Sequence, residues 1–122
     1  MPYLRFKGFP TEFLKMLAPR IVEEFAQIVN ITKEKVKIES LVTEAITQVP
    51  LSVEILMAPR KQEIHDAAAA MLNRLLKEYG YEQIHLFFII LNPRLYYRNG
   101  EPLASGSSTY APSEGVSYHG MT

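Results

Sequence analysis

The fold is decided by residues 52–91, SVEILMAPRKQEIHDAAAAMLNRLLKEYGYEQIHLFFIIL. Residues 52–57 read as a strand. Between residues 64 and 79, apolar side chains then recur at every third or fourth position, as on the buried face of a helix. Residues 84–91 are almost continuously apolar, which is typical of a strand covered on both faces. A strand, a helix and a second strand predict a β-α-β unit with parallel strands and a right-handed crossover.

The first part of the chain repeats this order. Residues 2–7 alternate as a strand does, residues 13–29 carry an apolar stripe at helical spacing, and residues 35–42 alternate again. Pro19 lies inside the stripe and predicts a kink or a new helix start, because it has no N–H for the helical hydrogen bond. Two units about 49 to 50 residues apart predict a duplicated β-α-β fold of the α+β class, with two layers. One layer is a four-stranded mixed sheet, and two helices lie on one face of it.

The sequence divides into one domain, residues 1–103, and a C-terminal segment, residues 104–122. The domain holds the two repeats, residues 2–48 and 52–98. The C-terminal segment is rich in Gly, Ser, Pro and Thr, which is typical of a flexible tail, but its tyrosines would also suit an arm docked on a neighbouring subunit. Both interpretations stay open.

The last apolar strand predicts self-association. Both of its faces need burial, whereas helices on one side of the sheet can cover only one of them. A closed, symmetric homo-oligomer is the simplest source of the second cover.

Composition limits the classes of function. The 122 residues include 13 Lys and Arg and 13 Asp and Glu, so the net charge of zero argues against binding nucleic acid by bulk electrostatics. The chain has no cysteine, which excludes disulfides and thiolate metal sites. The longest apolar run is far too short to span a membrane. The three histidines fall in different elements, so we expect no metal site. We also expect no cofactor and no membrane partner, and a soluble, cytoplasmic protein.

Pro2 is the candidate catalytic residue, because it directly follows the initiator Met1. Initiator Met is readily removed before Pro, and its removal would leave Pro2 as an N-terminal secondary amine. An ordinary α-amino group titrates at about 7.7–8.0. Burial beside cations lowers the pKa of such an amine, and a base that titrates near neutral pH suits proton-transfer catalysis.

Three segments carry a resemblance to a known family: MPYLRFK at residues 1–7, VEIL at residues 53–56 leading to Pro59-Arg60, and YYRNG at residues 96–100. Together with the repeat, they resemble the tautomerase superfamily, which includes 4-oxalocrotonate tautomerase and macrophage migration inhibitory factor. They are most similar to a small uncharacterised bacterial branch of it. The resemblance implies a homotrimer that moves a proton, in keto–enol fashion, on a small carboxylate-bearing substrate.

The same resemblance implies roles for six residues. Pro2 matches the catalytic proline. Lys37 stands where 4-oxalocrotonate tautomerase has a substrate-binding arginine, and Arg60 matches a family arginine at a strand-to-helix turn. Lys33 lies near a pocket lysine of the inhibitory-factor branch. The remaining two, Tyr96 and Tyr97, fall where the family places an aromatic pocket wall.

Structural interpretations compete with these roles. Lys33 and Lys37 also suit an exposed face, and Arg60 could pair with Glu63 or Glu54. We expect one of the two tyrosines at 96 and 97 to be packed. His65 is expected on the surface, pointing away from the apolar stripe.

Two alternatives to a tautomerase remain. One is a non-catalytic member of the same fold, so the sequence leaves open whether the protein is an enzyme. The other is a ferredoxin-like module that binds a small ligand, which shares the element order β-α-β-β-α-β but arranges its strands differently. Direct parallel pairing of the two strands within each repeat would favour the tautomerase-like fold.

Overall fold

The computed structural model describes residues 1–103. Its main elements are β1 (Tyr3–Lys7), α1 (Thr11–Val29), β2 (Lys37–Leu41), β3 (Ser52–Met57), α2 (Gln62–Glu78) and β4 (His85–Ile90). Two short 3-10 turns, η1 (Lys33–Lys35) and η2 (Pro93–Leu95), precede β2 and follow β4, and a small hairpin of β5 (Tyr97–Arg98) and β6 (Glu101–Pro102) comes last. The expected tail or docked arm, residues 104–122, lies outside the described residues.

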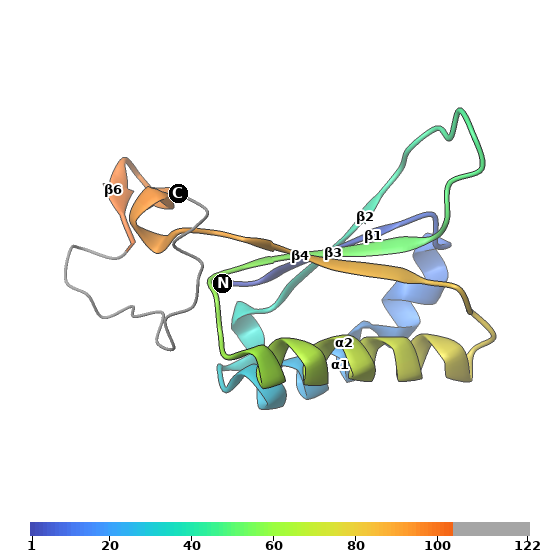
Figure 1. Ribbon diagram of the computed structural model, residues 1–122, viewed down its shortest axis with the longest axis horizontal. Coiled ribbons are helices and arrows are strands. Elements are labelled where there is room, and N and C mark those ends of the chain that lie inside the picture. The colour runs from blue at the N-terminus through green and yellow to red at the C-terminus, as the bar shows by residue number, and fades with distance from the viewer. Residues whose placement is uncertain (104–122) are drawn as a thin grey trace.

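The four long strands form one mixed sheet in the order β2-β1-β3-β4. β1 pairs in parallel with β2, and β3 pairs in parallel with β4, while the two halves meet through antiparallel pairing of β1 with β3. Figure 1 shows α1 and α2 together on one side of this sheet. The predicted duplicated fold is confirmed. Direct pairing within each half is inconsistent with a ferredoxin-like module, where another strand separates the two strands of a β-α-β unit.

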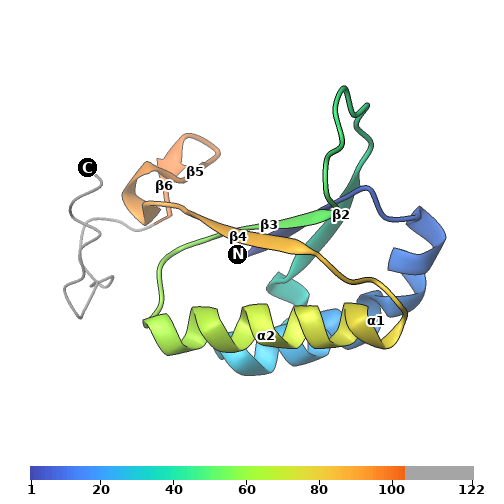
Figure 2. The ribbon, with the colours of Figure 1, turned by 45° about the vertical axis from the view of Figure 1, so that its right-hand side comes forward.

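Pro19 lies within α1, which continues through it as one helix rather than starting again. The α1 ribbon changes direction along its length, so the helix after Pro10 enters obliquely and then runs beside α2 (Figure 2). Leu17 and Ile21, on either side of Pro19, are fully buried. The bend therefore costs the helix no core contact, because the exposed proline occupies its outer side.

The core lies between the sheet and the two helices. Every second side chain of the central strands is buried there, and these meet the apolar stripes of both helices. The largest fully buried side chains are Phe6, Phe25, Leu4, Leu17, Ile21, Ile55, Met57, Leu72, Leu75, Leu76 and Val53. In the part of the chain that the structure describes, no helix has the length and apolar character needed to cross a membrane.

Among residues 1–103, no helix lies over the other face of the sheet (Figure 1). A row of charges crosses it, in which Arg5 reaches the carboxylates of Glu39 at 3.4 Å and Glu54 at 3.8 Å, and Lys7 reaches Glu54 at 2.8 Å. Beside this row, Phe87 and Ile89 of β4 are 44% and 40% exposed. Within residues 1–103, this face of β4 is thus only partly covered, as the sequence predicts for helices that lie on one side of the sheet.

Candidate active site

Strand direction brings three connections to the N-terminus. β1 begins at Tyr3, the parallel strand β2 begins beside it, and the antiparallel strand β3 ends beside it. The turn η1 and residues 58–61 therefore lie at the same end of the sheet. β4 ends level with β3, which adds η2 and the β5–β6 hairpin to this end (Figure 1).

The start of the chain is held in place. Pro2 is buried, and its carbonyl accepts a hydrogen bond of 2.9 Å from the backbone N–H of Lys37. Met1 is 41% exposed, so the side chain ahead of Pro2 reaches solvent. The N-terminal segment thus leads out of the sheet into a partly open space.

Three cations act on the N-terminal amine, which belongs to Met1. Burial lowers the pKa of the Met1 amine below its usual 8.0, and the charges of Arg60, Lys35 and Arg98 lower it further. Each cation comes from a different connection: η1 supplies Lys35, the β3–α2 connection supplies Arg60, and β5 supplies Arg98. The arrangement disfavours the protonated form of the Met1 amine and favours a negatively charged molecule beside it.

Arg60 lies just before α2, whose N-cap is Lys61, and not inside the first turn. Its guanidinium donates to the carbonyl of Pro59 at 3.4 Å, and partial burial lowers its pKa, although the residue as a whole is exposed. Such a side chain stays charged and reachable. The expected alternatives, ion pairs of Arg60 with Glu63 or Glu54, do not form within residues 1–103. Glu54 pairs with Arg5 and Lys7 instead.

His65 corrects the sequence-based expectation of a surface residue. Its Nε2 accepts a hydrogen bond of 3.1 Å from the backbone N–H of Arg60, and its ring packs edge-on against Phe88 with centroids 4.4 Å apart. The residue is half-buried. The expectation was wrong because His65 lies at the flank of the apolar stripe, in the first turn of α2, where a ring can reach both the sheet and the preceding backbone.

Two tyrosines join the N-terminal strand to the last segment. The hydroxyl of Tyr96 donates to the hydroxyl of Tyr3 at 3.3 Å, and this bond raises the pKa of Tyr96. The carbonyl of Tyr96 accepts from the N–H of Leu103 at 2.8 Å, which closes the β5–β6 hairpin that carries Arg98. Tyr97 is 55% exposed. As expected, one of the two neighbouring tyrosines is packed and the other is open.

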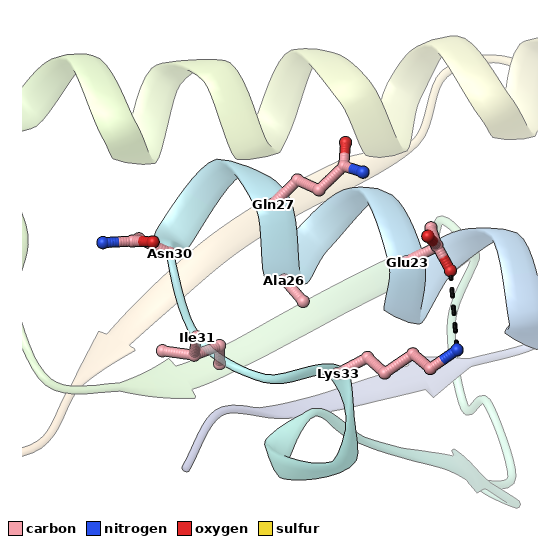
Figure 3. Close-up of a pocket in the computed structure, with 6 residues that line it drawn as sticks. All are labelled: Glu23, Ala26, Gln27, Asn30, Ile31 and Lys33. Carbon is pink, nitrogen blue, oxygen red and sulfur yellow. Dashed lines mark ion pairs between the residues drawn. The ribbon is translucent and has the colours of Figure 1, made fainter.

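The two predicted lysines fall in different places. Lys37 pairs with Tyr3 across the sheet, at the end where the amine lies, and its Nζ donates to the carbonyl of Glu34 at 3.0 Å. Lys33 instead reaches the carboxylate of Glu23 at 3.8 Å. Figure 3 shows this pair in an open groove of about 400 Å³ beside the end of α1. Lys33 is therefore not brought together with Arg60 and Lys35 around the amine.

Sequence reasoning missed Lys35 and Arg98 as members of the cluster. The predicted topology could have pointed to both. Lys35 lies just before β2 and Arg98 lies in the segment after β4, and the start of β2 and the end of β4 are at the same end of the sheet as the start of β1. Within the described range, no group of three or more metal-ligating side chains is placed to hold a metal ion. The cluster is thus cationic, with an amine at its centre.

The fold is that of the tautomerase superfamily. The wild-type symmetric trimer of the fused 4-OT called W0 matches with a TM-score of 0.65 at 14% identity, over 83% of this chain and 97% of that chain. A macrophage migration inhibitory factor-like protein from Entamoeba histolytica matches at 0.64 and 9% identity, over 82% and 96% of the two chains. Identities this low establish a shared fold and nothing more.

The chain belongs to the family described as Domain of unknown function (DUF1904), whose model matches residues 1–102. A structure of such a domain from Sebaldella termitidis ATCC 33386 has a TM-score of 0.76 at 21% identity, over 82% of this chain and 97% of that chain. None of the curated proteins matches this sequence.

Proposed function

We propose that this protein is a tautomerase-like enzyme that moves a proton, in keto–enol fashion, on a small carboxylate-bearing substrate, with Pro2 as the general base. The observation that supports this most is the surroundings of the chain's start, where burial and the charges of Arg60, Lys35 and Arg98 lower the pKa of the Met1 amine, which belongs to the residue next to Pro2. A base with a lowered pKa beside an anion-attracting cluster is what proton abstraction from a carbon acid requires.

Removal of Met1 is the first step of this proposal. It would make the Pro2 nitrogen the chain's amine, one residue further into the structure, where Pro2 is buried. That secondary amine takes a proton from the carbon next to the substrate carbonyl and returns it to a different atom of the same molecule. No electrons leave the substrate, so the reaction needs no oxidant.

The cations have separate tasks in the proposed reaction. Arg60 binds the substrate carboxylate, with Lys37 as a second contact at the same end of the sheet. Lys35 and Arg98 stabilise the negative charge that develops on the enolate oxygen, an electrostatic effect that is usually the largest single contribution to such steps. Tyr96 and Tyr97 form the aromatic wall, and Lys33, paired with Glu23, takes no part.

We further propose a homotrimer. The open face of the sheet, with Phe87 and Ile89 exposed, supports self-association, because apolar positions on sheet faces are normally covered. The fused 4-OT of the same fold is a symmetric trimer. A non-catalytic protein of the same fold remains the alternative, and retention of Met1 would favour it, because an acylated Pro2 nitrogen cannot act as a base.

The test begins with the intact mass of the purified protein, which should lack Met1. Tautomerisation of phenylpyruvate and 2-hydroxymuconate is then measured for the wild type and Pro2→Ala. We expect the variant to lose most of the rate, because a primary amine on a smaller residue replaces the rigid secondary amine. Equal rates in the two proteins would reject Pro2 as the base.

A further inference from the structure

His65 lies beside the cationic cluster without belonging to it. Its Nε2 is the acceptor for the Arg60 backbone N–H at 3.1 Å, which fixes the last turn of the β3–α2 connection. Backbone bonds of 2.9 Å from Ile64 and 3.3 Å from His65 to the Lys61 carbonyl hold the start of α2 itself. The imidazole thus links the Arg60 backbone to the first turn of α2 through a hydrogen bond.

This bond dictates the protonation state of the ring. A nitrogen that accepts a hydrogen bond carries no proton, so the neutral ring has its proton on Nδ1. Nδ1 is buried and has no hydrogen-bond partner within residues 1–103. A second proton on the ring would occupy Nε2 and turn the Arg60 contact into two donors facing each other.

We propose that His65 is a positioning residue for Arg60, and that protonation of its imidazole releases the Arg60 backbone and weakens anion binding beside the N-terminal amine. This inference rests on the proposed function for its consequence, the binding of a substrate carboxylate. Its structural part, the coupling of His65 to Arg60, stands on the contact alone.

The surroundings of His65 determine whether its pKa lies above or below the usual value. Burial lowers the pKa of its imidazole below 6.5, and the charge of Arg60 lowers it further. Asp66, on the same helix, acts in the opposite sense and is the smallest of the three effects. From the sheet, β4 contributes the uncharged ring of Phe88. The hydrogen bond from the Arg60 N–H to His65 Nε2 is therefore intact at neutral pH and is lost only at pH values below 6.5.

Two substitutions at position 65 distinguish the effect of losing the hydrogen-bond acceptor from the effect of protonating the imidazole. His65→Gln places an amide oxygen near the position of Nε2 and keeps an acceptor that does not titrate, whereas His65→Leu keeps an apolar contact with Phe88 and removes the acceptor. His85, exposed at the start of β4, supplies the matched control His85→Gln. Urea unfolding of each variant verifies that it is folded.

The first readout is the backbone amide signal of Arg60 in two-dimensional NMR between pH 5 and 8. In the wild type and His85→Gln, the signal should move with the titration of the His65 ring, at a pKa below 6.5. In His65→Gln it should stay flat, and in His65→Leu it should be shifted at every pH. The proposal would be overturned if the Arg60 amide shift did not change as the His65 ring titrates, or if it were the same in His65→Leu as in the wild type.

The second readout is KM for phenylpyruvate across the same pH range. His65→Gln keeps an acceptor that does not titrate, so the ratio of wild-type KM to His65→Gln KM at each pH reports the effect of protonating the imidazole, including any effect that reaches the amine through Arg60. That ratio should rise from about 1 at pH 8 to about 5–10 at acid pH, the size of one lost hydrogen bond. A ratio that stays constant would contradict the link to anion binding. Absence of turnover in every variant, with the NMR coupling intact, would instead reject the proposed function.

Discussion

Arg60 has the largest effect among the cations that act on the N-terminal amine, and it is also the residue that His65 ties to α2. Its guanidinium is partly buried yet free of ion pairs among the described residues. A charge in that state is available to a ligand and is not already neutralised within the fold.

Replacing this charge should therefore weaken substrate binding. For Arg60→Gln, we expect KM for phenylpyruvate to rise about 10- to 100-fold, because a charge-assisted hydrogen bond contributes roughly 1.5–3 kcal/mol. Steady-state kinetics measures it. The control is Arg94→Gln, since Arg94 is an exposed cation of η2 that does not act on the amine. An unchanged KM in Arg60→Gln would remove Arg60 from the proposed site.

The sequence predicted Pro2 from the chemistry of an N-terminal amine, and the other site residues only where a resemblance pointed to them. Pro2 and Arg60 do lie at the same end of the sheet, whereas Lys35 and Arg98 had no assigned role. The periodicity of α2 could not place His65, because a side chain at the edge of an apolar stripe turns inward or outward according to its partners. Here the partners are Phe88 and the backbone of Arg60, neither of which the helix pattern contains.

At the scale of elements, the hydrophobic pattern predicted nearly every boundary. β3 spans the predicted residues 52–57, and the ends of β1, β2 and β4 differ from the prediction by one or two residues. Such patterns succeed because the buried positions of a strand or helix repeat with its backbone geometry. α2 begins at Gln62, two residues before the predicted apolar stripe and after the connection that carries Arg60.

The end of α2 allows a specific test. Gly80 has a φ of 91°, and the next residue, Tyr81, donates to the carbonyl of Leu76 at 3.1 Å, which is the hydrogen bond of a Schellman cap. A Cβ at position 80 would meet nothing within 4 Å. Gly80→Ala should thus lower the free energy of unfolding by about 1 kcal/mol through backbone strain alone.

Urea denaturation of wild type and Gly80→Ala measures this difference. The matched comparison is Gly80→Asn, because asparagine tolerates the left-handed conformation better than alanine does and should cost less. Equal stability of wild type and Gly80→Ala would show that the cap does not constrain the backbone.

In the whole molecule, one layer of helices covers one face of the sheet (Figure 1). The other face carries the charges of Arg5, Lys7, Glu39 and Glu54 beside exposed apolar side chains. The sequence indicated this imbalance through the unbroken apolar run of β4. It could not say how the charges are paired, because that depends on the register between strands that are far apart in the chain.

The proposed homotrimer would cover this face. Light scattering of the wild type should give three times the chain mass of 13.9 kDa. Ile89→Asp should lower the mass, because it places an unpaired charge in the proposed interface. Met16→Asp is the control, since Met16 is 53% exposed on the outer side of α1 and should leave the trimer intact. A monomeric wild type would contradict the proposed assembly.

Burial and the charges of Arg60, Lys35 and Arg98 lower the pKa of the Met1 amine below 8.0. Once Met1 is removed, we expect the same surroundings to lower the pKa of the Pro2 amine, so activity should rise with pH as this amine loses its proton and then level off. The most direct measurement is an NMR titration of the Pro2 nitrogen in Met1-free protein labelled with ¹⁵N. We expect a pKa below that of Pro2 in the urea-unfolded chain, and a rise toward the unfolded value in Arg60→Gln. A pKa equal to the unfolded value, and unchanged by Arg60→Gln, would contradict this expectation.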